Sequence, residues 1–210
     1  MSDKKLTTIY IVRHGQTEWN VLKKMQGSSD IPLNSVGEEQ AKQLAQELKD
    51  TPLDLAFSSD LMRAKRTAEI IALEHKLEVQ ITKLLRERAS GDFEGKPYAV
   101  LDAYNELLDK MSDEERYTYK IPPERESDEE LINRVIPFLR ETAITHPSKT
   151  ILMATHGGVL KALAIHLGIG TYKTIGSHSI ENTAYIVLES DGIVFFVKKI
   201  KGITILLENK

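Results

Sequence analysis

The chain has 210 residues, of which 41% are hydrophobic and 28% are charged, so it can bury the core of a globular protein and is not largely disordered. Its formal net charge of −3 gives no support to binding of nucleic acid or of an anionic membrane, so any positive potential must be local. The chain has no cysteine, which excludes disulfides, thiolate metal sites and enzymes that use a thiol nucleophile.

The start of the chain and its hydropathy indicate a soluble protein. Residues 1–5 lead directly into the first predicted strand without the apolar region of a signal peptide. No apolar run approaches the ~18 residues of a membrane span. We also find no internal repeat, low-complexity tract or clear linker. We therefore expect a cytoplasmic protein with a single domain over residues 1–210, and neither nucleic acid nor membrane among its partners.

Strands and helices are expected to alternate along the chain. Strands are predicted at residues 7–12, 53–57, 78–81 and 150–154, and a final hairpin at 183–188 and 193–200 turns at Asp191-Gly192. Capping boxes starting at Ser35 and Ser127 predict two helix starts. Further helices are predicted at 61–75, after the capping cluster 58–60, at about 98–110 and at 157–167. Residues 20–33 and 112–126 are predicted to be irregular. This alternation is typical of an α/β fold with a mostly parallel sheet.

Two histidines follow predicted strands in the same way. His14 lies within Arg-His-Gly at residues 13–15, and His156 lies within Thr-His-Gly-Gly at 155–158. Because ligands bind at the carboxyl ends of parallel strands, both histidines are expected at one edge of the sheet, in a shared site. Gly15 is expected to let the backbone turn and a ligand approach closely. The two glycines after His156 open a helix whose free N–H groups suit an anion.

Arginines and a carboxylate complete a candidate phosphate site. Arg13 offers a planar guanidinium that matches phosphate oxygens. Arg63 lies in the first turn of the helix after the second strand, and Arg66, one turn later, is the alternative; both could instead lie on a solvated helix face. Glu87, between two arginines, is either an ion-pair partner or the acid that protonates a leaving alkoxide. The other histidine positions suggest no metal ligand set, and His166 and His178 are predicted to be structural or exposed.

These residues carry a resemblance to the histidine phosphatase superfamily, which has the phosphoglycerate mutase-like fold. Four blocks resemble its motifs in family order: residues 13–20 with 26–41, residues 58–68, residues 85–95 and residues 155–158. The resemblance covers nearly the whole chain. It implies a three-layer α/β/α fold around a mostly parallel sheet.

The resemblance also implies a mechanism. His14 would attack phosphorus and carry the phosphoryl group, and Glu87 would act as general acid and base. Arg13, Arg63 and His156 would surround the phosphoryl oxygens, and the other nitrogen of His14 should donate to a carbonyl or similar acceptor. The implied substrate-binding set is Asn20, Gln26, Gly27, Gly157 and Thr17. No metal is needed, and no cofactor except 2,3-bisphosphoglycerate if the protein is a mutase.

Within the superfamily, the chain resembles the phosphatase branch. The segment after Glu87 lacks the tyrosine that follows the acid in phosphoglycerate mutases, and only 69 positions separate Glu87 from His156. The block 85–92 is similar to metal-independent phosphoserine phosphatases. We therefore predict hydrolysis of a small phosphorylated metabolite, phosphoserine among the candidates. The alternatives are a cofactor-dependent phosphoglycerate mutase and an inactive binding or signalling protein on the same fold.

Residues 112–127, which we call the connector, are where substrate choice is expected to lie, although this segment could also be a solvated charged loop. Many phosphatases of the family have Pro-x-Gly-Glu-Ser here, and this chain keeps Glu126 and Ser127 but has Arg125 in place of the glycine. That departure leaves the substrate open. The C-terminal hairpin, or another sheet edge, could pair two copies into a homodimer.

Overall fold

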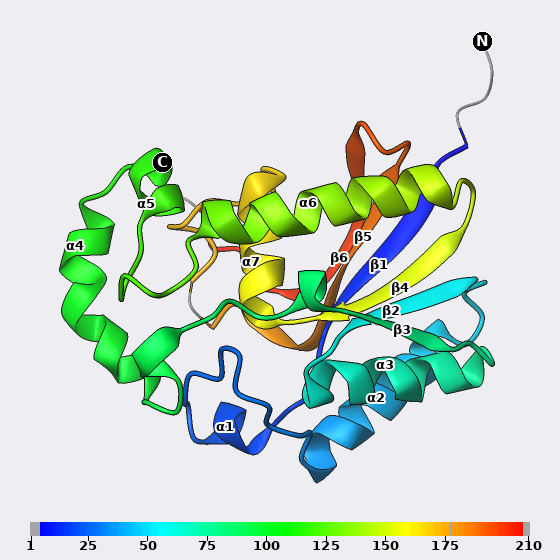
Figure 1. The fold of residues 1–210 in the computed structure, drawn as a ribbon, viewed down its shortest axis with the longest axis horizontal. Coiled ribbons are helices and arrows are strands. Elements are labelled where there is room, and N and C mark those ends of the chain that lie inside the picture. The colour runs from blue at the N-terminus through cyan, green and yellow to red at the C-terminus, as the bar shows by residue number, and fades with distance from the viewer. Residues whose placement is uncertain (1–4, 177, 208–210) are drawn as a thin grey trace.

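The computed structural model describes residues 5–176 and 178–207, and its centre is a six-stranded sheet (Figure 1). The order of strands across the sheet is β3-β2-β4-β1-β5-β6. The expectation about the chain start falls largely on residues 1–4, which lie outside the described residues. The strand bounds are β1 Thr7–Arg13, β2 Leu55–Ser59, β3 Val79–Thr82, β4 Thr150–Thr155, β5 Ile180–Ser190 and β6 Phe195–Ile203.

The sheet is mostly parallel, as predicted. β3, β2, β4 and β1 run in one direction, and β5 and β6 form an antiparallel hairpin beside β1. β1 pairs with β4 so that Arg13 lies opposite Thr155, and the His14 N–H donates to the Thr155 carbonyl at 3.0 Å. The register therefore places His14 and His156 one residue beyond the ends of adjacent strands.

Helices cover both faces of the sheet, which confirms the three layers (Figure 1). α2 (Ser35–Leu48) and α3 (Met62–Glu74) pack on one face, and α6 (Asp128–Thr145) and α7 (Gly157–His166) on the other. Side chains of β1 alternate between the layers because successive residues of a strand point to opposite faces. Ile9 and Ile11 join the core under α6 and α7, whereas Val12 joins the core under α2.

The helix starts differ in detail from the predictions. The residue that caps α2 is Asn34, whose side chain accepts the Gly37 N–H at 2.8 Å, so the capping box at Ser35 was wrong. α3 has no local side-chain cap; instead the Met62 N–H donates to Asp30 Oδ1 at 2.6 Å. The capping box of Ser127 with Glu130 at the start of α6 is confirmed.

The segment between β3 and α6 carries short helices beyond the ends of the strands (Figure 1). The helix predicted at 98–110 was wrong as one element: it is a 3₁₀ helix, Tyr98–Tyr104, followed by α4 (Asn105–Asp109). No side chain of the 3₁₀ helix is buried, so no apolar stripe holds the segment as one α-helix. The connector is not wholly irregular, because Ser112 and Glu115 form a capping box that starts α5 (Asp113–Thr118).

The loop after β1 is also partly helical. A short helix, α1 (Glu18–Val21), begins after Thr17 and overlaps the first two residues of the loop predicted at 20–33. Gly15 serves a close backbone approach rather than a turn, since a Cβ there would lie 2.3 Å from the Gly37 carbonyl oxygen at the start of α2. No helix in the described part of the chain is long and apolar enough to cross a membrane.

Candidate active site

A cavity of about 860 Å³ opens at the carboxyl ends of β1 and β4. It collects residues from distant parts of the chain, because the segment between β3 and α6 lies next to these strand ends (Figure 1). Eight of the ten predicted site residues line it: Arg13, His14, Asn20, Gln26, Gly27, Arg63, Glu87 and Gly157. His156 and Thr17 are not among the lining residues. Thr17 instead caps α1, where its side chain accepts the Asn20 N–H.

One ring nitrogen of His14 is hydrogen-bonded to the backbone. Its Nδ1 lies 2.6 Å from the Gly15 carbonyl oxygen, and a carbonyl can only accept, so Nδ1 carries the proton and Nε2 carries the lone pair. This is the arrangement predicted for a nucleophilic imidazole. Burial lowers the pKa of His14 well below 6.5, and the charges of Arg63 and Arg13 lower it further, so the ring is neutral.

His156 lies directly behind His14, with ring centroids 5.2 Å apart and planes at 60°. Its Nε2 is 2.9 Å from the Ser59 hydroxyl, which already accepts the Leu61 N–H at 3.3 Å. We assign the hydroxyl proton to the bond with Nε2, which leaves the proton of the neutral ring on Nδ1. That nitrogen is buried and has no partner. In this assignment His156 holds a buried donor that has no protein partner.

Arg13 and Arg63 are held by backbone carbonyls. Arg13 Nη1 donates to the Ile180 carbonyl, while Arg63 donates to the carbonyls of Ser29 at 2.7 Å and Gly27 at 2.8 Å. The Nε atom of each arginine is buried without a partner. Both guanidinium groups are thus fixed, and each keeps a free donor.

Arg63 and Arg66, the two alternatives on α3, lie in different surroundings. Arg66 is exposed and forms a bidentate ion pair with Glu38, at 2.8 and 3.2 Å, whereas Arg63 is fully buried. The structure brings Arg63, and not Arg66, to the cavity.

Glu87 is held by two backbone N–H groups, those of Arg88 at 2.8 Å and Gly158 at 3.0 Å. The glycines after His156 permit this approach. A Cβ on Gly158 would lie 2.3 Å from Glu87 Oε1, and a Cβ on Gly157 would lie 3.1 Å from Arg13 Nε. The N–H of Gly158 at the start of α7 therefore binds the Glu87 carboxylate. Of the two glycine amides that we expected to serve an anionic ligand, only that of Gly157 can still do so.

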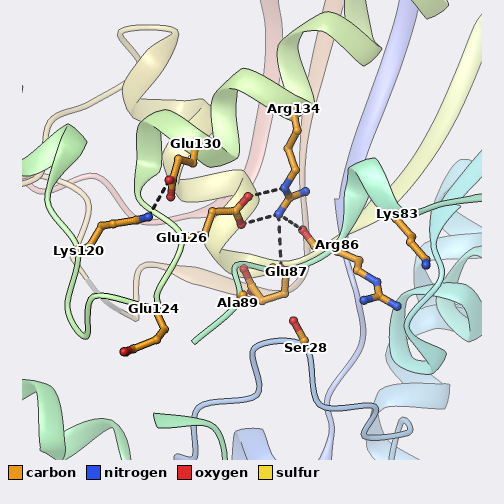
Figure 2. Close-up of a pocket in the computed structure, with 10 residues that line it drawn as sticks. All are labelled: Ser28, Lys83, Arg86, Glu87, Ala89, Lys120, Glu124, Glu126, Glu130 and Arg134. Atoms are coloured by element: carbon orange, nitrogen blue, oxygen red, sulfur yellow. Dashed lines mark hydrogen bonds and ion pairs between the residues drawn. The ribbon is translucent and has the colours of Figure 1, made fainter. Parts of the chain in front are cut away.

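Arg134 of α6 fixes the backbone that carries Glu87. Figure 2 shows its guanidinium between the Glu126 carboxylate and the chain at residues 86–87. It contacts Glu126 with two bonds of 2.6 and 2.8 Å, and it donates to the carbonyls of Leu84 at 2.7 Å and Arg86 at 2.8 Å. Arg134 thereby joins the end of the connector to the segment that carries Glu87.

Several lining residues escaped the sequence analysis. They are cationic or aromatic side chains that come from outside the four motif blocks or were not singled out within them: Lys23, Arg88, Tyr98, Arg116, Lys161 and Tyr172. His178, predicted to be structural or exposed, is exposed but lines the cavity and packs edge-on against Tyr98 at 5.5 Å. Arg125, which the sequence analysis named in the connector, also lines the cavity. In the described residues, no group of three or more His, Cys, Asp or Glu side chains is placed to hold a metal ion.

The neutral, buried histidines predict that stability falls in mild acid. In the unfolded chain His14 and His156 take up protons near pH 6.5, whereas burial and neighbouring arginines keep both neutral in the native state. The unfolded state then binds more protons, so the free energy of unfolding is steady above pH 6.5 and falls below it. Between pH 7.5 and 5.5 we expect a loss of roughly 2–3 kcal/mol, measured by urea unfolding. A variant with asparagine at both positions should lose clearly less, and an equal loss would contradict this origin.

The chain is similar to known proteins over most of its length. The model of the histidine phosphatase superfamily (branch 1) matches residues 9–201. The chain belongs to this superfamily. Among its relatives, the uncharacterized phosphatase PhoE of Bacillus subtilis (strain 168) is 37% identical over 165 residues, which are 79% of each chain.

Solved structures of the superfamily include both phosphatases and mutases. A mutant phosphoserine phosphatase from Entamoeba histolytica in complex with phosphoserine has a TM-score of 0.77 and 26% identity, over 92% of this chain and 96% of that one. The phosphoglycerate mutase of Bacillus anthracis has a TM-score of 0.80 and 26% identity, over 95% of this chain and 94% of that one. The chain is thus a phosphatase-like or mutase-like member of the histidine phosphatase superfamily.

Proposed function

We propose that the protein hydrolyses a small phosphomonoester through a phosphohistidine on His14, without a metal. The observation that carries this proposal is the free Nε2 of His14, in a cavity that Arg13 and Arg63 also line. His14 Nε2 holds a lone pair, while Arg13 Nε, Arg63 Nε and His156 Nδ1 are unpartnered. Buried donors without partners cost free energy, and phosphoryl oxygens would satisfy them.

In this proposal, side chains of this chain carry out each step of the reaction. His14 Nε2 attacks phosphorus, the bond from phosphorus to the ester oxygen breaks, and protonated Glu87 gives its proton to that oxygen. Water next attacks phosphorus, Glu87 takes a proton from the water, and the nitrogen–phosphorus bond breaks to release phosphate. Arg13, Arg63 and His156 hold the phosphoryl oxygens throughout. Catalysis of this kind needs mainly position and fixed positive charge, which the buried arginines supply.

Two observations favour hydrolysis over the mutase reaction. The short spacing between Glu87 and His156 leaves less chain to enclose a bisphosphate, so water has access as acceptor. The relative PhoE is a phosphatase by name, and a structural neighbour holds phosphoserine, which makes phosphoserine the first ester to test. The mutase is the second candidate, because the Bacillus anthracis mutase has the same fold with a TM-score of 0.80.

The test is release of inorganic phosphate in EDTA from a panel containing phosphoserine, 3-phosphoglycerate and fructose bisphosphates. We expect release from at least one ester, at a rate unchanged by EDTA. If no phosphate appears but 3-phosphoglycerate becomes 2-phosphoglycerate once 2,3-bisphosphoglycerate is added, the protein is a mutase. If folded protein does neither, it is a binding protein on this fold.

A further inference from the structure

The cavity contains far more positive charge than the proposed phosphoryl site uses. Seven arginine and lysine side chains line it, against three carboxylates. Only Arg13 and Arg63 belong to the phosphoryl site. The surplus is local, since the whole chain has a formal net charge of −3.

Four of these cations form a group that we call the second cationic cluster: Arg88, Arg116, Arg125 and Lys161. They come from different parts of the chain. Arg88 follows Glu87 directly, Arg116 lies on α5, Arg125 lies near the end of the connector, and Lys161 lies on α7. All four line the same cavity, and the charges of the three arginines all act on Lys161.

Two members of the cluster have carboxylate partners. Arg88 forms a buried ion pair with Asp128 at the start of α6. Arg116 lies 3.9 Å from Asp109, a carboxylate that is 77% exposed and therefore neutralises it weakly.

The other two members have none. Within residues 5–176 and 178–207, no ion pair joins a carboxylate to Arg125 or Lys161, and Arg125 Nε is buried without a hydrogen-bond partner. Burial, with Arg88 nearby, lowers the pKa of Arg125 to about 10, and burial, with Arg116 nearby, lowers that of Lys161 to about 8. Partly buried cations without counterions are unfavourable, and a bound anion would offset that cost.

Arg125 is also the residue at which this connector departs from the family pattern. The sequence has an arginine where the pattern described in the sequence analysis has a glycine. This chain adds a guanidinium that reaches the cavity. Substrate choice specific to this chain is therefore expected to involve Arg125.

We propose that Arg125 and Lys161, assisted by Arg116, bind a second anionic group of the substrate. The preferred substrates are then phosphomonoesters that also carry a carboxylate or a second phosphate. This inference rests on the proposed function, because it places the ester's phosphoryl group at His14 and its other anion at the second cationic cluster.

The test uses pairs of esters that differ in one anionic group. Phosphoserine is paired with phosphoethanolamine, 3-phosphoglycerate with glycerol 3-phosphate, and fructose 1,6-bisphosphate with fructose 6-phosphate. We expect kcat/KM to be at least about tenfold higher for the ester with the second anion in at least one pair, since charge-assisted hydrogen bonds are the strong ones. The pair with the largest ratio shows whether the group is a carboxylate or a phosphate.

Variants then assign the preference to residues. Arg125→Gln and Lys161→Gln should each lower the ratio towards one, because each variant loses a cation that would bind the second anion. The matched control is Lys65→Gln on α3, whose side chain is half exposed and lies near Glu69, away from the cavity; it should leave the ratio unchanged. Equal kcat/KM within every pair, or an undiminished ratio in both variants, would overturn the proposal.

Binding separates this inference from the proposed function. Dissociation constants of the same pairs are measured by calorimetry on His14→Ala protein, with and without Arg125→Gln. If the wild-type protein hydrolyses esters but binds both members of every pair equally, the proposed function stands and the second subsite falls. If no ester is hydrolysed, the proposed function falls, while tighter binding of the doubly anionic member that is lost with Arg125→Gln still supports the subsite.

Discussion

Replacing His14 with alanine is expected to lower phosphate release by about 10⁴-fold or more and to abolish the phosphorylated protein. Nε2 of His14 keeps its lone pair because Nδ1 is bound to the Gly15 carbonyl, and His14 lines the cavity. Without it, water must attack phosphorus directly. Initial rates on the best ester in EDTA measure the first effect. Phosphate bound to protein that is stable in alkali and labile in acid measures the second.

The control is a second histidine variant that leaves the site intact. His166 is exposed in the last turn of α7, so His166→Ala should keep wild-type rates and form the phosphorylated protein. Because His14 is buried, urea unfolding must show that His14→Ala is folded at the assay temperature. A folded His14→Ala protein that still forms acid-labile phosphate would show that another residue is the nucleophile.

Replacing Arg63 with alanine is expected to lower kcat/KM by roughly 10²- to 10³-fold or more, the effect of losing one fixed donor to a transferring group. Its guanidinium is fully buried, its Nε has no partner, and the carbonyls of Gly27 and Ser29 hold it in place. Loss of these bonds leaves two carbonyls unsatisfied and should lower the free energy of unfolding by about 2 kcal/mol or more. Steady-state kinetics and urea unfolding measure the two effects.

The matched variant is Arg66→Ala, one turn later on the same helix. Arg66 is half exposed and pairs with Glu38, so we expect kcat/KM within about threefold of wild type and a stability change below about 1 kcal/mol. Arg63→Lys keeps the charge but loses the planar fork, and its rate should lie between those of wild type and Arg63→Ala. Comparable kinetic losses in Arg63→Ala and Arg66→Ala would contradict the site as described.

The parts of the site that could be predicted follow from short-range rules. A strand that ends in a histidine and a glycine, found twice, predicts two histidines at one edge of a parallel sheet. The pairing of β1 with β4, with Arg13 opposite Thr155, places His14 and His156 as that rule requires. The three layers follow in the same way from alternating strands and amphipathic helices.

The remaining features depend on contacts between distant segments. The rotation of α3 that buries Arg63 and exposes Arg66 depends on where the helix starts, and its first N–H is capped by Asp30 of another segment. Arg116 reaches the cavity because the chain between β3 and α6 turns back over the strand ends, and no periodic pattern predicts that path. The helix predicted at 98–110 fails for a related reason, since its first seven residues bury no side chain.

The ion pair of Arg134 with Glu126 limits how connectors could be exchanged between members of this superfamily. Arg134 joins Glu126 to the carbonyls of Leu84 and Arg86, so one side chain anchors both the end of the connector and the segment of the acid (Figure 2). A transplanted connector that replaces residues 112–125 would leave these contacts of Arg134 intact. One that extends through position 126 without a glutamate there would remove a partner of Arg134 and loosen the support of Glu87. Recombination designed to change substrate preference therefore needs either a crossover point between Arg125 and Glu126 or a donor connector that has glutamate at position 126.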